Sequence, residues 1–181
     1  MNILVLSDIH GALKPLHDIL AYAGLKSFDT VLFVGDFLNP GPRNPITPSY
    51  NPTQVADQIN AITLPKLAVR GNCDSEVDQM LIHLPLMNDY LYLKTPRKNI
   101  LVTHGHLHPE QLPEAFDIQI SGHTHIPLIA REKDRLFLNP GSIALPKGGF
   151  PPSFGELTDT DFTIRNAESF QVLMQVNFDG E

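Results

Sequence analysis

The sequence NILVLSDIH, residues 2–10, holds the pattern that decides the fold: a short apolar run that ends at two polar side chains. Residues 2–6 form a leucine-rich and β-branched run without alternation, which is typical of a strand buried on both faces. Asp8 and His10 follow this predicted strand directly. In open α/β sheets, ligands bind beyond the carboxyl ends of the strands. The pattern therefore predicts a strand that presents a carboxylate and an imidazole at one sheet edge.

The same arrangement recurs along the first half of the chain. Residues 30–34 and 66–69 are two further buried strands by the same criterion. Apolar residues within 13–23 have helical spacing, and Thr53 is predicted to cap a second helix over residues 55–62. This alternation of strands and helices predicts a parallel sheet.

The second half is different, because short strand candidates follow one another without intervening helices. They lie at residues 90–93, 99–102, 118–120, 128–131, 135–138, 154–157, 162–164 and 170–176. No repeat or linker divides the chain. We therefore expect one domain over residues 1–181, of the α/β class (α+β by some criteria), with two packed sheets and helices outside.

Polar residues of one chemical kind follow five of the predicted strands. They are Asp8 and His10, Asp36, Asn72 and Asp74, His104 and His106, and His123 and His125. Any one of them has an ordinary interpretation, such as Asp8 as a helix cap or Asn72 as a turn residue. These ordinary interpretations fail together, since the five groups of residues stand at the ends of five different strands.

The residue types in this set suit divalent metal ions. Asp, His and Asn without a thiolate favour ions such as Mn, Fe or Zn. One residue separates Asp8 from His10, and one separates His123 from His125. On an extended backbone, both side chains of such a pair point to the same side and can reach one ion. Seven ligands are too many for one tetrahedral ion, and they match two ions that share one carboxylate.

These motifs resemble those of the calcineurin-like metallophosphoesterases. The motifs are Asp8-Ile9-His10, Gly35-Asp36, Gly71-Asn72-Cys73-Asp74, Thr103-His104-Gly105-His106 and Gly122-His123-Thr124-His125. The resemblance runs from residue 3 to about residue 148. Residues 41–44, 70–79 and 146–149 look closer still to the bacterial YfcE-type phosphodiesterases. Each motif alone is weak, but all five in order are specific.

The resemblance implies a fold, a site and an activity. The fold would be a four-layer α-β-β-α sandwich of two mixed sheets with the site at the strand ends. The first metal would be held by Asp8, His10 and His125, the second by Asn72, His104 and His123, with Asp36 as the bridge. Manganese is the metal that the YfcE-type resemblance suggests, with Ni, Fe and Zn as alternatives. The activity would be hydrolysis of small phosphodiesters by a metal-bound hydroxide.

Three further residues are candidates for catalysis. Arg43 is the cation expected to contact the substrate phosphate, because its guanidinium offers a bidentate fork. The family usually has a histidine where this chain has Cys73, and nearby cations would move that thiol towards a thiolate, which cannot donate a proton. The leaving group must then take its proton from His106 or from water, or need little help. Cys73 and Arg43 also have structural interpretations, as a packing residue and a solvated loop charge.

Composition limits the partners. The formal net charge of -7 and the absence of a basic stripe argue against a grip on long nucleic acid. One cysteine allows no internal disulfide, and no signal peptide or membrane span is apparent, so we expect a cytoplasmic protein. The YfcE-type resemblance leans towards a homo-oligomer. Two alternative functions stay open, a catalytically silent scaffold for a protein partner and a nucleotide phosphatase.

Two structural questions are also open. Arg70 and Asp74 either orient metal ligands or form an ion pair. The proline-rich loop at residues 39–52 either covers the site or serves as an oligomer contact.

Overall fold

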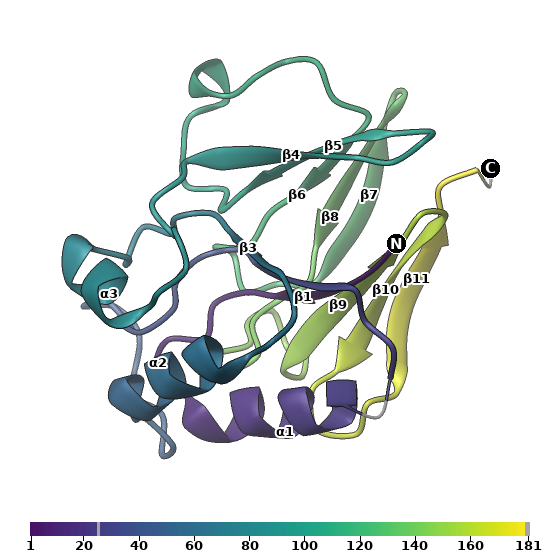
Figure 1. The fold of residues 1–181 in the computed structure, drawn as a ribbon. Coiled ribbons are helices and arrows are strands. Elements are labelled where there is room, and N and C mark those ends of the chain that lie inside the picture. The colour runs from purple at the N-terminus through teal and green to yellow at the C-terminus, as the bar shows by residue number, and fades with distance from the viewer. Residues whose placement is uncertain (25, 180–181) are drawn as a thin grey trace.

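Two β-sheets pack face to face in the computed structural model, which describes residues 1–24 and 26–179 (Figure 1). The first sheet has six strands in the order β11-β10-β9-β1-β2-β3. These are β11 (Val172–Asn177), β10 (Asp161–Asn166), β9 (Ser153–Thr158), β1 (Asn2–Leu6), β2 (Thr30–Phe33) and β3 (Lys66–Ala68). The second sheet has five, in the order β4 (Tyr90–Lys94), β5 (Asn99–Thr103), β6 (Ile118–Ile120), β8 (Arg135–Asn139) and β7 (Leu128–Glu132).

Both sheets are mixed. The predicted parallel pairing holds for β1, β2 and β3, and β9 then adds to β1 in the antiparallel sense. In the second sheet β5, β6 and β8 are parallel, while β4 and β7 pair antiparallel at the two edges. The carboxyl ends of both parallel sets carry the polar residues predicted from the sequence.

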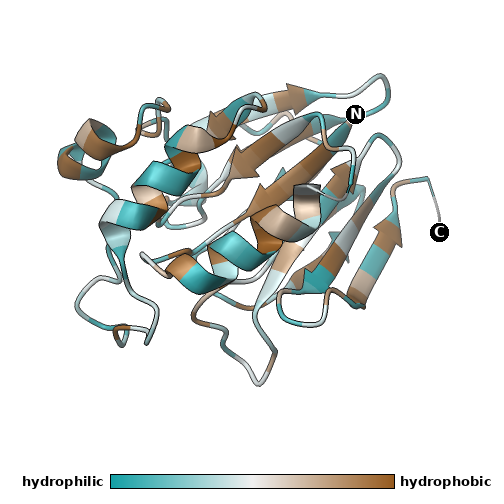
Figure 2. Cartoon of the chain, turned by 60° about the horizontal axis from the view of Figure 1, so that its bottom comes forward, coloured by the Kyte–Doolittle hydropathy of each residue, from teal (hydrophilic) through white to brown (hydrophobic). Residues whose placement is uncertain are grey.

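The central strand β1 is buried on both faces, as its unbroken apolar run predicted. Leu4 and Leu6 belong to the core on the helix side, whereas Ile3 and Val5 belong to the core between the sheets. Successive strand residues point to opposite faces, so both sets must be apolar. Figure 2 shows hydrophobic residues along several strands, while the helices α1 and α2 carry both hydrophilic and hydrophobic residues.

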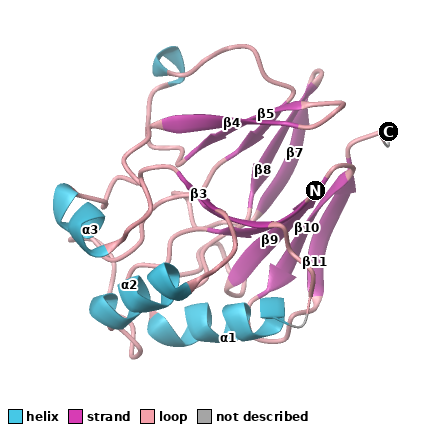
Figure 3. Ribbon diagram, in the orientation of Figure 1, coloured by secondary structure: helices cyan, strands magenta, loops and turns pink. Residues whose placement is uncertain are grey.

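Three α-helices lie on one side of the molecule (Figure 3). They are α1 (Leu13–Gly24), α2 (Pro52–Ala61) and α3 (Glu76–Leu81), of which α3 was not predicted. The predicted cap of the second helix was wrong: Asn51, not Thr53, accepts the backbone N–H of Gln54 at 3.2 Å. Pro52 explains the difference, since proline suits the first helical position that follows a cap.

The other side of the sandwich is covered mainly by irregular chain. Among the described residues after α3, the helical element is a 3₁₀ turn, η1 (Pro109–Gln111), on the loop after β5. The Tyr92 hydroxyl donates to the carbonyl of Ala115 at 3.2 Å, and Phe116 meets Phe137 edge-on. The sandwich with helices outside is confirmed, with a thin layer on the second sheet. No helix in the described part of the chain is long and apolar enough to cross a membrane.

Candidate metal centre

The seven predicted metal ligands converge on one edge of the two sheets. β1 leads to Asp8 and His10, β2 to Asp36, β3 to Asn72, β5 to His104, and β6 to His123 and His125. Asp8, His10, Asp36, His104 and His125 are buried, with at most 2% of each residue exposed. Because carboxylates and imidazoles are costly to bury without partners, this density of them indicates a functional site.

The first group of ligands surrounds one carboxylate oxygen of Asp8. Asp8 Oδ1 lies 3.3 Å from His125 Nε2 and 3.7 Å from His10 Nε2. Its other oxygen, Oδ2, accepts hydrogen bonds from the Ser7 hydroxyl and the backbone N–H of His123. Oδ1 itself is buried and has no hydrogen-bond partner in the described structure. A buried carboxylate oxygen left over in this way, beside two imidazole nitrogens, fits a metal ligand.

The second group surrounds the side-chain oxygen of Asn72. Asn72 Oδ1 lies 2.7 Å from His123 Nδ1 and 3.2 Å from His104 Nε2. Asp36 connects the two groups, because its Oδ2 lies 3.5 Å from His104 Nε2 and 3.6 Å from His10 Nε2. The Asp36 carboxylate therefore lies between the two groups of predicted ligands.

Three imidazoles are oriented by backbone carbonyls. The Nδ1 atoms of His10, His104 and His125 lie 2.8, 2.6 and 2.6 Å from the carbonyl oxygens of Asn39, Val34 and Leu145. A carbonyl only accepts, so each Nδ1 carries the proton and donates. Each Nε2 then points into the ligand cluster, where its lone pair can bind a cation once the nitrogen carries no proton. This second hydrogen bond is the usual device that sets the tautomer of a metal-binding histidine.

Most of the ligands also share an unusual backbone. The residues with positive φ that are not glycine include Asp8, His10, Asp36, His123 and His125, at 47–66°. Beyond these five, the described chain has two others, Lys133 and Phe170. Left-handed conformations are uncommon for residues with side chains, and strained backbone concentrates at functional sites. The extended backbone expected at the two alternating pairs was wrong, since these residues are left-handed.

The charges in the cluster shift one another's pKa. Burial opposes ionisation of both partners, but the Asp36 and Asp8 carboxylates outweigh it and raise the pKa of His104 to about 9. In turn, despite the burial of the carboxyl group, the His104 imidazolium holds the pKa of Asp36 well below its usual range. Without metal, a proton therefore sits where a cation would.

Asp74 positions the bridge. Its carboxylate accepts the backbone N–H groups of Asp36, Phe37 and Gly71 at 2.7–2.9 Å. Burial nevertheless raises its pKa to about 6. Arg70, by contrast, forms an ion pair with Asp89 at 2.7 Å. The question left by the sequence therefore has two answers: Asp74 orients a ligand, and Arg70 is in an ion pair.

Cys73 lies beside the bridge. Its backbone N–H donates to Asp36 Oδ1 at 2.9 Å, and its sulfur accepts from the Asn72 amide at 3.2 Å. Burial, followed by the Asp36 carboxylate, raises the pKa of the thiol to about 12. Without metal, Cys73 is therefore a thiol. A thiolate was predicted from the sequence for the site with bound cations, and the pKa of about 12 applies to the site without them.

His106 lies beside the second ligand group. Its ring centroid is 5.4 Å from that of His104 and 6.3 Å from that of His123. Its Nδ1 is buried without a hydrogen-bond partner in the described structure, and burial lowers the pKa of the ring. The imidazole is therefore neutral and next to the cluster.

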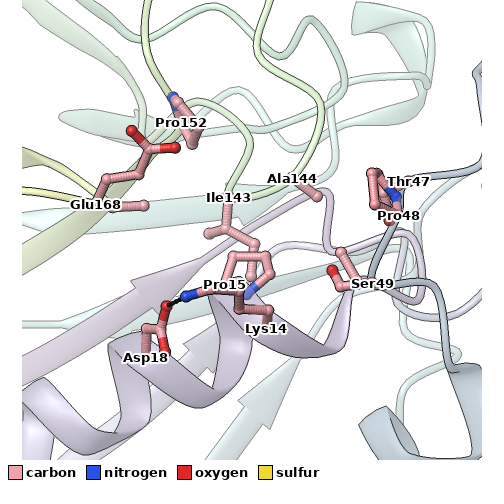
Figure 4. A pocket seen from close by; sticks show the side chains of 12 residues that line it. Lys14, Pro15, Asp18, Thr47, Pro48, Ser49, Ile143, Ala144, Pro152 and Glu168 are labelled. Atoms are coloured by element: carbon pink, nitrogen blue, oxygen red, sulfur yellow. Dashed lines mark hydrogen bonds and ion pairs between the residues drawn. The ribbon is translucent and has the colours of Figure 1, made fainter.

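A cavity of 360 Å³ opens over the ligands. It is lined by Asp36, Arg43, Asn44, Asn72, His123, Thr124, His125 and Lys147. Arg43 thus lies where the sequence placed it, and the loop at residues 39–52 contributes to the cover of the site. Lys147 was missed as a site residue, although residues 146–149 had been noted for their resemblance to a known family. A second cavity, of 220 Å³, lies between Lys14, Thr47, Ala144 and Glu168 and includes none of the seven ligands (Figure 4).

These residues fit divalent metal ions. In the described structure, Asp8 Oδ1 is buried without a hydrogen-bond partner. The Nε2 atoms of His10, His104 and His125 point into the cluster, and Asp36 lies between the two groups of predicted ligands. The groups Asp8, His10 and His125, and Asp8, Asp36 and His104, each bring their ligand atoms within 4.8 Å of one another. Nitrogen and oxygen donors of this kind suit transition metals such as Mn, Fe and Zn.

Comparison with known proteins agrees with this chemistry. The chain matches the calcineurin-like phosphoesterase superfamily domain over residues 1–161. It is 37% identical to phosphodiesterase YfcE of Escherichia coli (strain K12) over 179 residues, 97% of each protein. It is 30% identical to the probable metallophosphoesterase YsnB of Bacillus subtilis (strain 168), with 87% of this chain and 84% of YsnB covered.

A solved structure of the E. coli phosphoesterase Yfce matches the fold with a TM-score of 0.93 at 36% identity. The match covers 99% of this chain and 100% of the other. A sequence match over most of the length, a shared fold and a set of converging metal ligands lead to one conclusion. The chain belongs to the calcineurin-like phosphoesterase superfamily and is an enzyme of that class.

Proposed function

We propose that this enzyme is a divalent-metal-dependent phosphodiesterase that hydrolyses small phosphodiesters at a site for two metal ions. The observation that carries the proposal is the unpartnered Asp8 Oδ1, buried among imidazole nitrogens that are already oriented by backbone carbonyls. A buried polar atom without a partner is costly, and a cation removes that cost.

Each ligand has a role in this proposal. Asp8, His10 and His125 would hold the first ion, Asn72, His104 and His123 would hold the second, and Asp36 would be a ligand of both. When bound, the ions would offset the charge of the phosphate and lower the pKa of a water molecule. We propose Mn as the metal, by similarity to YfcE, with Ni, Fe and Zn as alternatives.

The remaining residues act on the substrate. Arg43 lines the cavity and offers two parallel N–H donors to an oxyanion of the substrate. His106 lies beside the second ligand group and is our candidate for proton transfer to the leaving group, through the protonated form that its lowered pKa leaves in the minority near neutral pH. Cys73 holds Asp36 through its backbone N–H, and its thiol supplies no acid near neutral pH.

The test is reconstitution of the metal-free enzyme with Mn, Ni, Zn or Mg, followed by assays on matched phosphomonoesters and phosphodiesters. We expect two ions per chain by elemental analysis and the highest activity on diesters. Absence of hydrolysis with every metal would contradict the proposal. An Asp8→Asn variant serves as the control, because it keeps the volume but weakens the ligand, and it should bind fewer ions.

A further inference from the structure

Each residue that lines the cavity over the metal ligands has a polar side chain. The 360 Å³ of the cavity are lined by charged, amide, hydroxyl and imidazole side chains, and no apolar residue of the described chain contributes. Most small-molecule pockets are lined mainly by apolar side chains with a few polar groups among them. The part of a substrate that occupies this cavity is therefore charged or strongly polar.

Two cations reach this cavity from different loops. Arg43 lies on a loop held by the hydrogen bond from the Asn44 amide to the carbonyl of Pro40 at 2.8 Å. The backbone N–H of Lys147 donates to the carbonyl of His125 at 3.2 Å. Lys147 is thus held against His125, and the loop of Arg43 is tied to His10, whose Nδ1 lies 2.8 Å from the carbonyl oxygen of Asn39.

Neither cation has an acidic partner among the described residues. Elsewhere in the structure Lys26 pairs with Glu156 and Arg165 does the same, both at 2.8 Å. The side chains of Arg43 and Lys147 are exposed, as is that of Lys94, which also has no acidic partner among the described residues, but Arg43 and Lys147 are the two cations that line this cavity. Asp36, the carboxylate that lines the same cavity, is a metal ligand in the proposed function.

The charge balance of the site shows what these cations lack. Two divalent ions bring four positive charges, and the carboxylates of Asp8 and Asp36 return two negative ones. One diester phosphate and the attacking nucleophile can neutralise the remainder. The positive charges of Arg43 and Lys147 are then still without a counter-charge.

We infer that Arg43 and Lys147 bind a second anionic group of the substrate, a carboxylate or phosphate beyond the scissile phosphodiester. This rests on the proposed function for the position of the scissile phosphate. The guanidinium fork of Arg43 and the point charge of Lys147 both suit an oxyanion. The substrate class is then a phosphodiester with an additional negative charge on its polar moiety.

The binding test compares two phosphomonoesters that differ by one carboxylate. Mn-loaded enzyme is titrated calorimetrically with ethyl phosphate and with 2-carboxyethyl phosphate. We expect the wild type to bind 2-carboxyethyl phosphate about tenfold more tightly, as for one charge-assisted contact. The double variant Arg43→Gln/Lys147→Gln should reduce this preference to less than about twofold. Equal affinities in the wild type, or an unchanged preference in the double variant, would overturn the inference.

A matched control is Lys94→Gln. Lys94 is exposed and pairs in β4 with Asn99, at the end of β5 opposite His104. The Lys94→Gln substitution removes one positive charge at a site away from the cavity. The variant should therefore prefer 2-carboxyethyl phosphate by the same factor as the wild type. A loss of preference in Lys94→Gln would mean that net charge, and not the two cations, sets the affinity, and would overturn the inference.

Kinetics separate this inference from the proposed function. p-Nitrophenyl ethyl phosphate and p-nitrophenyl 2-carboxyethyl phosphate share one leaving group and differ by one carboxylate, so a difference in kcat/KM reports on that carboxylate. We expect the carboxylate to raise kcat/KM through KM in the wild type and to do so less in the double variant. Equal values would overturn the inference and leave the proposed function intact. Failure to hydrolyse either diester would overturn the proposed function, and the calorimetric affinities would still decide the inference.

Discussion

The left-handed backbone of the ligand residues is a cost that the surrounding structure must offset. Asp8, His10 and Asp36 have φ between 47° and 56°, and such conformations cost on the order of 1–3 kcal/mol each. Backbone hydrogen bonds hold them in place: Asp8 donates to Gly35, and both Ile9 and His10 donate to Asp36. The strain turns the side chains inward at the strand ends, which a regular strand could not do.

Cys73 supports a prediction about the leaving group. A diester with an aryl leaving group needs little protonation, so the wild type should hydrolyse aryl diesters faster than alkyl diesters. Cys73→His introduces an imidazole that titrates near neutral pH and can donate a proton. The ratio of aryl to alkyl kcat should fall by about tenfold or more, within the range for general acid catalysis. Steady-state kinetics on matched diesters measure this ratio.

Cys73→Ser is the control for that substitution. A hydroxyl has the size of the thiol but no pKa near neutrality, so the ratio should stay close to the wild-type value. Similar aryl and alkyl rates in the wild type would show that a proton donor is already present, with His106 as the first candidate.

At the scale of elements, the loops after β2 and β3 must approach very closely. A Cβ on Gly71 would lie 2.1 Å from Asp36 Oδ1 and 2.4 Å from the Asp36 nitrogen. A Cβ on Gly122 would lie 2.0 Å from the Ser7 hydroxyl, at the end of β1. These glycines leave the space in which neighbouring strand ends bring their ligands together.

Gly71→Ala should therefore displace the bridge. We expect a loss of unfolding free energy of about 1–3 kcal/mol, as for overpacking, and fewer than two bound metal ions per chain. Thermal unfolding and elemental analysis after dialysis measure the two effects. Gly24→Ala is the matched control, because a Cβ there meets nothing within 4 Å. It should be neutral or slightly stabilising, and full metal content in Gly71→Ala would refute the packing argument.

At the scale of the whole molecule, the buried charges couple metal binding to stability. The pKa of His104 is raised to about 9 in the metal-free protein, from about 6.5 in the unfolded chain. A base whose pKa is raised by folding stabilises the fold fully below the unfolded pKa. That stabilisation is lost as the pH rises through the folded pKa.

The metal-free enzyme should thus lose unfolding free energy, on the order of a few kcal/mol, as the pH rises from about 6.5 to 9. The metal-loaded enzyme should not, because metal binding requires the neutral imidazole and displaces its proton. Urea unfolding with chelator or with Mn across this range measures both. His104→Gln isolates the contribution of this residue, and an identical slope in the metal-free variant would show that the His104–Asp36 pair is not its source.

Residue types and periodicity were enough to predict most of the order of elements and the residues that meet at the candidate metal site. Strands such as β1 are buried on both faces, so their apolar runs are visible without any neighbour. Metal-binding side chains are few in kind, and five motifs in order carry the family resemblance. The short helix α3 and the cap at Asn51 were missed, because six residues give little periodicity and both Asn51 and Thr53 are residue types that can cap a helix.

Tertiary structure alone decided the geometry of the site. The partnerless oxygen of Asp8, the support of Asp36 by Asp74 and the left-handed ligands depend on contacts between strand ends far apart in the sequence. Lys147 lines the cavity because its loop packs back against His125, a contact that the sequence does not reveal. Sequence patterns record local periodicity and residue type, whereas charge balance and close approach arise when separate segments meet. The residues that converge at the candidate metal site were therefore predictable, and the second cation at the cavity was not.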